Sequence, residues 1–492
     1  MGRLVPKDNK WKTSTLGDIG FWAIGSGFPL LEQGSLTGNI LFAKVSDMNN
    51  LGNEKFILET NNTITEETAK RLRVNVHPSG TVIFPKIGGA IATNKRRILV
   101  KPTVIDNNCL GITPNVGVST EWIYLLLCGI DLSKYQAGTS VPALAQSVLQ
   151  RIPVMLPEET EQHRIVAKVD ELMALCDQLE NQHTDAIAAH EKLVSYLLDT
   201  LTKSQDAADF NESWQRIAAN FEMLFTTESS IDALKQTLLQ LAVMGKLVPQ
   251  DASDEPASEL LKRIHVEKAK LVAEGKVKKS KQLAEICDDE KPFDLPIGWE
   301  WIRVSEVAKL ITSGSRDWAQ YLSDKGAKFI TMGNLSRGSY ELRLDNMRFV
   351  NPPNTGEGSR TKLEPFDLLI SITGDVGNLG RIPENFGDAY INQHTCLLRF
   401  FTQCQNRYFP EILRSPMAKV QFNEPQRGVK NSFRLGDLEN MVIPLPPLTA
   451  QVRIVAKIDE LMTLCDTLKS RITAANQLQQ KIADVMVEQA VA

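Results

Sequence analysis

The chain has 492 residues, 42% of them hydrophobic, and a formal net charge of -4. This length exceeds what one hydrophobic core supports, so several domains are expected. The longest apolar run, residues 122–130, is far shorter than the roughly 20 residues that span a bilayer, which excludes a helical membrane protein. The polar residues 1–8 lack the apolar core of a signal peptide, and we expect a cytoplasmic location. The seven cysteines include no Cys-x-x-Cys pair and the histidines show no ligand spacing, so we expect neither a disulfide framework nor a metal site.

Residues 1–157 have the sequence character of a mixed α/β domain. Short runs rich in β-branched and aromatic residues, such as residues 40–45 and 81–87, are separated by glycine and asparagine turns and predict strands. Between residues 10 and 157 there are 14 basic and 10 acidic residues. A mild basic excess of this kind suits a surface that contacts an anion.

Residues 158–245 form the first helical region. Pro157 precedes two glutamates, as is typical before the first turn of a helix. Apolar residues then recur at alternating steps of four and three without glycine or proline, which predicts a helix of about 40 residues, or about 60 Å. Its pairing face begins with Ile165, Val169, Leu172, Cys176 and Leu179. Six basic and 16 acidic residues make this region acidic, which indicates either a partner distinct from the anion or a solvated helix face.

Residues 246–295 are interpreted as a linker. They contain charged stretches, including the basic run at residues 278–281. A solvated, partly flexible helical linker explains this composition, and contact of the basic run with DNA phosphate is the alternative.

Residues 296–446 and 447–492 repeat this organisation. The segment at residues 445–466 matches residues 156–177 at most positions, which indicates two similar structural units in one chain. The second helix carries the same apolar stripe, at Ile454, Ile458, Leu461, Cys465 and Leu468. Because neither helix can bury its stripe alone, we expect the two to pack on each other. Residues 328–332 and 367–372 predict strands of a second α/β domain, with 18 basic and 16 acidic residues between 296 and 446.

A second repeat joins the two ends of the chain. Residues 242–249 resemble residues 490–492 continued by residues 1–6, as though a cyclic molecule had been opened at a point equivalent to its middle. A pseudo-twofold arrangement is expected from this pattern.

The order of these pieces is similar to that of the specificity subunits of Type I restriction–modification enzymes, over essentially the whole chain. The matching residues in the first half are Gly138-Thr139-Ser140, Leu144, Ile152-Pro153, Leu156-Pro157, Glu161-Gln162 and Ile165. Those in the second half are Leu435, Leu438, residues 442–447, Gln451 and Ile454, and the central ones are residues 234–236, 242–250 and 295–301. The chain departs from the family at Glu158, where a second proline is frequent, and at Ala450, which stands where the first copy has Glu161.

The resemblance implies an α+β protein. Two α/β target recognition domains (residues 1–157 and 296–446) would alternate with two long helical regions (158–245 and 447–492) that pair as an antiparallel coiled coil. It also implies a subunit without catalysis that reads a bipartite sequence in double-stranded DNA, one half-site per domain. Two methyltransferase subunits and two restriction (motor) subunits would bind S-adenosylmethionine, ATP and magnesium and perform adenine-N6 methylation or cleavage.

Two alternative functions differ in where the enzymatic activity lies. One is a reader that serves a fused methyltransferase–nuclease; the other is a self-contained DNA adenine methyltransferase. The turn Asn351-Pro352-Pro353-Asn354 resembles the amino-methyltransferase motif but lacks the aromatic residue that stacks on a flipped base. The glycine-rich residues 374–380 have the wrong spacing for a dinucleotide-binding loop, and we interpret them as a turn near DNA or as a plain loop.

The candidate DNA-binding residues are basic and amide side chains near predicted loops, the types that contact phosphates and base edges. In the first domain they are Ser26, Gly27, Lys86, Lys95, Arg96 and Arg97. In the second domain they are Ser315, Arg316, Asn334, Arg337, Asn378, Arg427, Lys430 and Asn431. Combined replacement of Arg96 and Arg97 by alanine is expected to weaken binding and reduce its salt dependence.

Overall fold

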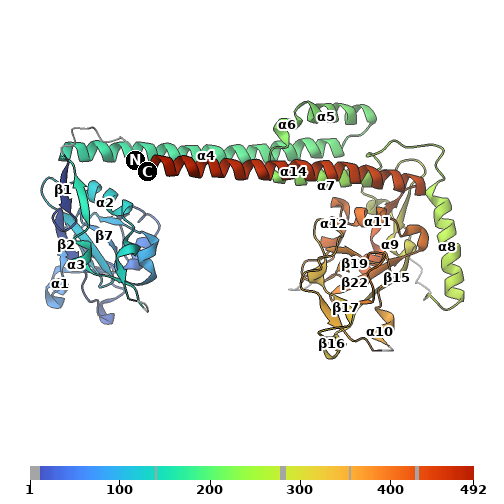
Figure 1. Ribbon diagram of the computed structural model, residues 1–492, viewed down its shortest axis with the longest axis horizontal. Coiled ribbons are helices and arrows are strands. Elements are labelled where there is room, and N and C mark those ends of the chain that lie inside the picture. The colour runs from blue at the N-terminus through green and yellow to red at the C-terminus, as the bar shows by residue number, and fades with distance from the viewer. Residues whose placement is uncertain (1–10, 139–140, 278–283, 354–355, 427–430, 492) are drawn as a thin grey trace. The chain divides into compact units, whose positions relative to one another are not determined.

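The computed structural model describes residues 11–138, 141–277, 284–353, 356–426 and 431–491 (Figure 1). It divides into two compact units, one of Met1–Asp185 with Gln489–Ala492 and one of Ala186–Glu488. Each unit contains one β-rich domain and is described by itself. None of the described helices is both long enough and apolar enough to cross a membrane.

The domain of the first unit contains two sheets that share a core. The central sheet has the order β2-β10-β7-β8-β4, and the smaller sheet has the order β5-β3-β9-β6. Strands β3 and β7 are buried along their whole length because both faces of each sheet are covered, which explains their uninterrupted apolar sequences. The elements are β1 (Lys12–Thr15), β2 (Gly20–Ile24), β3 (Ile40–Ala43), β4 (Phe56–Ile57), β5 (Thr63–Ile64), α1 (Glu66–Leu72), β6 (Val76–His77), β7 (Val82–Pro85), β8 (Arg97–Leu99), β9 (Thr103–Ile105), β10 (Cys109–Pro114), α2 (Thr120–Gly129), β11 (Gln136–Ala137), β12 (Ala143–Leu144), α3 (Gln146–Leu149) and β13 (Pro153–Leu156).

The domain of the second unit repeats this topology. Its central sheet runs β15-β22-β19-β20 and its smaller sheet runs β16-β18-β17-β21, with β17 parallel to β21 as β3 is parallel to β9. The strands predicted at residues 40–45, 81–87, 328–332 and 367–372 are confirmed as β3, β7, β17 and β19. The elements are β14 (Glu300–Arg303), α9 (Val304–Val307), β15 (Ala308–Ser313), β16 (Leu322–Ser323), β17 (Ala327–Ile330), β18 (Arg348–Val350), α10 (Glu357–Arg360), β19 (Leu368–Ser371), β20 (Leu379–Arg381), β21 (Ala389–Ile391), β22 (Thr395–Phe400), α11 (Tyr408–Leu413), α12 (Pro416–Asn423), α13 (Leu435–Asn440) and β23 (Val442–Leu445).

Two long helices follow the two domains, as the heptad pattern predicts. Helix α4 (Glu159–Thr202) and helix α14 (Leu448–Val491) have 44 residues each. Within the second unit, the end of α4 and the first half of α14 run in opposite directions, and α7 (Glu228–Val243) lies along α14 (Figure 1). Leu198 and Leu201 of α4 share a core there with Leu461 and Cys465 of α14. Antiparallel packing of the two apolar stripes is therefore confirmed for this part of the helices.

The predicted pairing face needs a correction in its details. Leu461, Cys465 and Leu468 pack against α7 and the end of α4, whereas Ile454 and Ile458 belong to the core of the second domain. On α4, Ile165 and Val169 are half-buried and Leu172, Cys176 and Leu179 are exposed. Within the second unit, it is the end of α4 that packs against the first half of α14.

The interpretation of residues 246–295 as a solvated linker is wrong for part of the segment. Helix α8 (Ala257–Ala273) buries Ala257, Leu260 and Ile264 in the core of the second domain. The basic run at residues 278–281 lies outside the described residues. Before α7, the short helices α5 (Ala207–Ala219) and α6 (Phe221–Leu224) fold back onto the helical core.

The motif around Gly245 and Lys246 fastens these helices together. Lys246 donates hydrogen bonds to the carbonyl oxygens of Thr202 (3.3 Å) and Ser204 (2.7 Å), which satisfies the end of α4. Gly245 has φ +71°, and a Cβ atom at this position would lie 2.5 Å from Pro296. Glycine is therefore required both by the left-handed backbone and by the close approach of the second domain.

A buried glutamine attaches each β-rich domain to the first turn of its long helix. Gln162 is fully buried; it accepts a hydrogen bond from the Ser119 amide (2.8 Å) and donates to the carbonyl oxygens of Gly117 and Pro157 (3.0 Å each). In the second unit, Gln451 is also fully buried, donating to the Pro446 carbonyl oxygen (3.0 Å). Its side-chain oxygen accepts from Asn406 (2.6 Å). The repeated Pro-x-x-x-x-Gln spacing thus encodes one attachment used twice.

Replacement of Gln162 by leucine should destabilise the first unit. The substitution preserves approximate size but leaves one buried amide and two buried carbonyl groups unpaired, so the free energy of unfolding should fall by about 2–4 kcal/mol. Urea unfolding followed by tryptophan fluorescence would measure the change. Gln178→Leu on the exposed side of the same helix is the matched control. Equal midpoints for the two variants would contradict the proposed role of Gln162.

Candidate nucleic-acid interface

Three segments meet at one edge of the central sheet in the first unit. This strand-end edge is formed where β2 ends, where β7 ends and where β10 begins, since Leu110 pairs with Ile24 and Cys109 pairs with Pro85. Just beyond the strands, the Ser26 amide donates to the Ile105 carbonyl oxygen (2.8 Å) and Ser26 pairs with Asp106. The edge therefore gathers residues that are distant in sequence.

The second unit builds the same edge with β15, β19 and β22. Ser313 pairs with Cys396 and Ser371 pairs with Thr395, so the ends of β15 and β19 meet the beginning of β22. The Ile372 amide donates to the His394 carbonyl oxygen (3.1 Å), as the Lys86 amide donates to that of Asn108 (2.8 Å) in the first unit. These matched backbone bonds make Lys86 equivalent to Ile372 and Asn108 equivalent to His394.

The side chains on these equivalent backbone positions differ. The first edge presents Lys86 and the exposed Asn108, whose side chain donates to Asp106 (3.0 Å). In the second edge, His394 Nδ1 lies 2.8 Å from Thr373 Oγ1 and its Nε2 lies 2.9 Å from Gln393 Nε2. Amide, imidazole and ammonium groups are the types that hydrogen-bond to base edges and phosphates. The two edges therefore offer different contacts to a ligand on the same backbone arrangement.

Glycines allow the loops of this edge to approach each other. A Cβ atom on Gly25 would lie 1.9 Å from the Asp106 carbonyl oxygen, and one on the equivalent Gly314 would lie 2.2 Å from that of Ile391. Gly88 and Gly374 follow β7 and β19 with φ +75° and +68°. Only glycine adopts such conformations without strain, which keeps the loops in this close arrangement.

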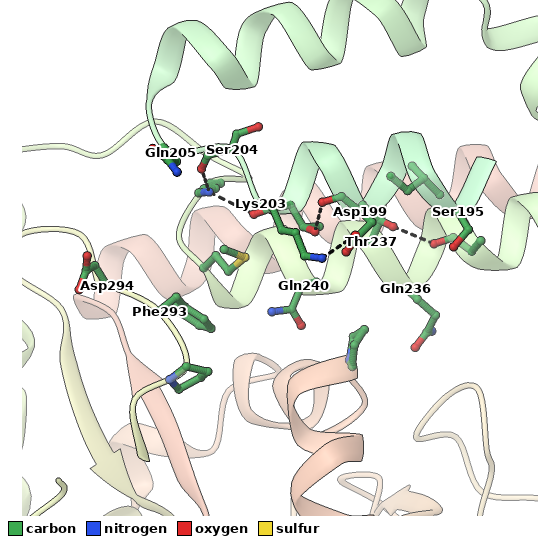
Figure 2. A pocket seen from close by; sticks show the side chains of 17 residues that line it. Ser195, Asp199, Lys203, Ser204, Gln205, Gln236, Thr237, Gln240, Phe293 and Asp294 are labelled. Atoms are coloured by element: carbon green, nitrogen blue, oxygen red, sulfur yellow. Dashed lines mark hydrogen bonds and ion pairs between the residues drawn. The ribbon is translucent and has the colours of Figure 1, made fainter. Parts of the chain in front are cut away.

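A cavity of about 1000 Å³ lies elsewhere in the second unit, beside α4 and α7 (Figure 2). Figure 2 shows Asp199 of α4 and Lys203, which follows that helix, on one side and Gln236 and Gln240 of α7 on another. Lys203 donates to Asp199 (2.7 Å), and Gln240 accepts from the Met417 amide (3.1 Å), so these groups take part in structural contacts. Among the described residues, no three His, Cys, Asp or Glu side chains are grouped so as to hold a metal ion.

The family comparison matches both repeats of the chain. The model of the "Type I restriction modification DNA specificity domain" matches residues 8–189 and 296–478, which is most of the sequence. The chain belongs to this family. Each match begins in a β-rich domain and ends within its long helix, so one specificity domain comprises a recognition fold and the helix attached through its buried glutamine.

Two relatives and one solved structure give the extent of the likeness. The chain is 38% identical over 432 residues to the Type I restriction enzyme EcoEI specificity subunit of Escherichia coli, covering 84% of this chain and 70% of that subunit. It is 39% identical over 348 residues to the EcoAI specificity subunit of Escherichia coli, covering 69% of this chain but only 58% of that subunit. A chain from the structure described as "Structural basis underlying complex assembly and conformational transition of the type I R-M system" has the same fold. Its TM-score is 0.52 with 17% identity, over 99% of this chain and 98% of that chain.

Several predicted DNA-binding residues lie on the strand-end edges of the two specificity domains. Ser26 and Lys86 are half-buried there, and Gly27 is exposed. In the second domain Ser315 follows the strand-end glycine, Arg316 is exposed next to it, and Asn431 is exposed beside Gly374, whose amide donates to its carbonyl oxygen (3.2 Å). These six residues remain candidates for contact with DNA.

Three predicted residues are buried and make hydrogen bonds within their domains, which disfavours their predicted contact with DNA. Arg96 is 1% exposed and donates to the carbonyl oxygens of Leu127 (3.1 Å) and Lys95 (2.8 Å), and burial lowers its pKa to about 10. Asn334 is 5% exposed, accepts from the Thr331 amide and donates to the Arg343 carbonyl oxygen (2.9 Å). Asn378 is 7% exposed and donates to Asp375 (3.1 Å). A loop sequence alone does not distinguish these structural side chains from exposed ones.

The remaining predicted residues either make hydrogen bonds within the protein or lie outside the described residues. Arg97 donates to the carbonyl oxygens of Arg96 and Met48 (2.7 Å each), and Lys95 donates to Asn49. Arg337 is exposed and donates to Asp375 (2.8 Å). Arg427 and Lys430 lie outside the described residues, as does Asn354 of the turn resembling a methyltransferase motif.

Sequence reasoning missed Asn107, Asn108, Thr373, Gln393 and His394. In the first domain Asn107 and Asn108 precede β10; in the second, Thr373 follows β19 and lies near Gln393 and His394, which precede β22. A signal was present, because a cluster of amide and imidazole side chains immediately precedes an apolar strand in both domains. Such clusters are typical of turns, and their common location depends on a strand order that the sequence does not reveal.

Replacement of Arg96 by alanine should reduce stability rather than DNA contact. The substitution leaves the carbonyl groups at the end of α2 unpaired and opens a void, so the unfolding free energy should fall by about 3 kcal/mol. Thermal unfolding would measure this effect, with Lys101→Ala at an exposed site of the same domain as control. An unchanged midpoint for Arg96→Ala, with weaker DNA binding, would restore Arg96 to the interface.

Proposed function

We propose that this protein is the DNA-recognition subunit of a Type I restriction–modification complex. Each specificity domain reads one half of a bipartite sequence in double-stranded DNA through its strand-end edge. The chain itself is non-catalytic and acts in the cytoplasm, where it directs adenine-N6 methylation or cleavage by its partners.

The observation that carries this proposal is that the two domains share the backbone hydrogen bonds of the strand-end edge but place different side chains on it. Lys86 and Asn108 in one domain stand where Ile372 and His394 stand in the other, on matched backbone hydrogen bonds. A catalytic pair would need the same groups in both copies to perform the same reaction. A reader of two different half-sites instead needs one scaffold and two sets of contacts.

Membership of the family supports a proposal for the partners and their cofactors. We propose two methyltransferase subunits that bind S-adenosylmethionine and the target adenine, and two restriction subunits that bind ATP and magnesium. The relatives' names, specificity subunits of Type I restriction enzymes, support this assignment.

Genome-wide mapping of N6-methyladenine tests the proposal. The chain and its methyltransferase subunit would be expressed separately and together in a methylation-free host. A bipartite motif methylated only in the combined strain is the expected result. Methylation by this chain alone would refute the non-catalytic role, and no methylation in the combined strain would refute the reader role.

Single substitutions at the two edges should relax different halves of that motif. Asn108→Ala removes an amide that suits adenine, and His394→Ala removes the imidazole at the equivalent place. Each variant should methylate sites with one altered base in one half, and the two halves should differ. Methylome sequencing of both strains is the measurement, and relaxation of the same half by both variants would contradict one domain per half-site.

Lys86→Ala should weaken binding to all sequences and reduce its salt dependence. If the ammonium group contacts one phosphate, the slope of log K against log salt concentration should become shallower by about 1. Fluorescence anisotropy of the complex with the methyltransferase subunit at several salt concentrations would measure it. Lys12→Ala, at an exposed position on β1, is the matched control. An unchanged slope would remove Lys86 from the phosphate contacts.

A further inference from the structure

A short turn in the first domain holds two neighbouring leucines in water. The 3-10 helix η1 (Leu30–Glu32) leaves Leu30 85% and Leu31 98% exposed. Single exposed apolar side chains are ordinary on protein surfaces, but adjacent leucines at one tip are an apolar feature with nothing covering it in the structure.

Both ends of the turn are nevertheless attached to the domain. Phe28 stacks on the fully buried Phe42 of β3, with ring centroids 3.6 Å apart. Gln33 donates to the Phe28 carbonyl oxygen (3.1 Å) and accepts from Lys44 (2.7 Å). Glu32 pairs with Arg71 of α1 at 2.5 Å. The turn is thus attached to the domain at three points, while its two leucines are exposed.

The turn begins directly after the strand-end edge. Gly27 and Phe28 connect it to Ser26, which pairs with Asp106 beside Asn107 and Asn108. Lys44 and Arg71 reach the turn through Gln33 and Glu32, and Glu32 neutralises Arg71, so the net positive charge of this group comes from Lys44. An apolar tip beside a cation, and next in sequence to the side chains proposed to read bases, suits DNA, whose apolar base faces are flanked by phosphates.

We propose that Leu30 and Leu31 form a wedge that inserts between adjacent base pairs in or beside the first half-site and kinks the duplex. This inference rests on the proposed function, because it requires the strand-end edge to face DNA. Apolar side chains that enter a base step unstack it at a cost that depends on the sequence of that step. The wedge would therefore add sequence preference at a position that no hydrogen bond reads.

The test uses the complex of the full chain with its methyltransferase subunit and a duplex carrying the mapped bipartite site. 2-Aminopurine placed at successive positions in and beside the first half-site reports unstacking by increased fluorescence, and end-labelled duplexes report bending by energy transfer. The test variant is Leu30→Ser with Leu31→Ser. Val116→Ser, at a fully exposed position in the same domain, is the matched control.

The wild-type and control complexes should unstack one step and bend the duplex, and the double variant should do neither. Its affinity for the site should fall about tenfold, because the burial of the leucines is lost while the cost of unstacking is no longer incurred. A mismatch at the unstacked step lowers the cost of insertion, so it should tighten binding of the wild-type complex and not of the variant. Thermal unfolding of the variant should match that of the wild type, because the replaced side chains are exposed.

Four outcomes would overturn the wedge. Site-specific binding without unstacking at any probed step would refute the wedge and leave the proposed function intact. Equal unstacking by the variant would do the same. Loss of assembly with the methyltransferase subunit in the variant would assign the leucines to a protein contact. If the wild-type complex binds no bipartite site, the proposed function fails together with the wedge.

Discussion

A buried glutamine at the start of each long helix is the contact on which the position of each recognition domain depends. Gln162 and Gln451 each satisfy backbone or side-chain groups of the domain on one side and of the proline turn on the other. An amide suits this place because it both donates and accepts, whereas a carboxylate would only accept. Since both copies are fully buried, water cannot replace these hydrogen bonds, and each domain is held to the first turn of its helix.

The helical core of the second unit depends in turn on contacts at helix ends. Lys246 donates hydrogen bonds to carbonyl oxygens at the end of α4. Gln250 connects the same turn to Trp299, because its side-chain oxygen accepts from the indole nitrogen (3.0 Å). Along α7, Lys235 pairs with Asp466, and Asp232 with Lys469 (2.6 Å), beside the apolar stripe. Exposed ion pairs of this kind add little stability. They specify which residues of α7 face α14, while the apolar contacts provide most of the stabilisation.

Sequence periodicity was sufficient to predict the long helices, the two α/β domains and four of their strands, because these features are local or repeated. It failed where a side chain's role depends on distant backbone. Arg96 lies in a basic run typical of a DNA contact, yet the carbonyl groups that hold it belong to α2, some 30 residues later. His394 and Thr373 meet only because β19 and β22 are neighbours in the sheet. The shared topology of the two domains was equally hidden, since it depends on strand orders that join distant segments of the chain.

The strand-end edge explains how one fold can carry two specificities. The hydrogen bonds that define the edge are made by backbone groups, such as the amides of Lys86 and Ile372, and do not depend on side-chain identity. The glycines that the loops require, Gly25 and Gly314, lie beside these positions rather than at them. A substitution at a reading position therefore changes the contact offered to DNA while the frame keeps its bonds. Stability resides in the sheet and the glutamine attachment, and recognition resides in side chains that the sheet tolerates in more than one form.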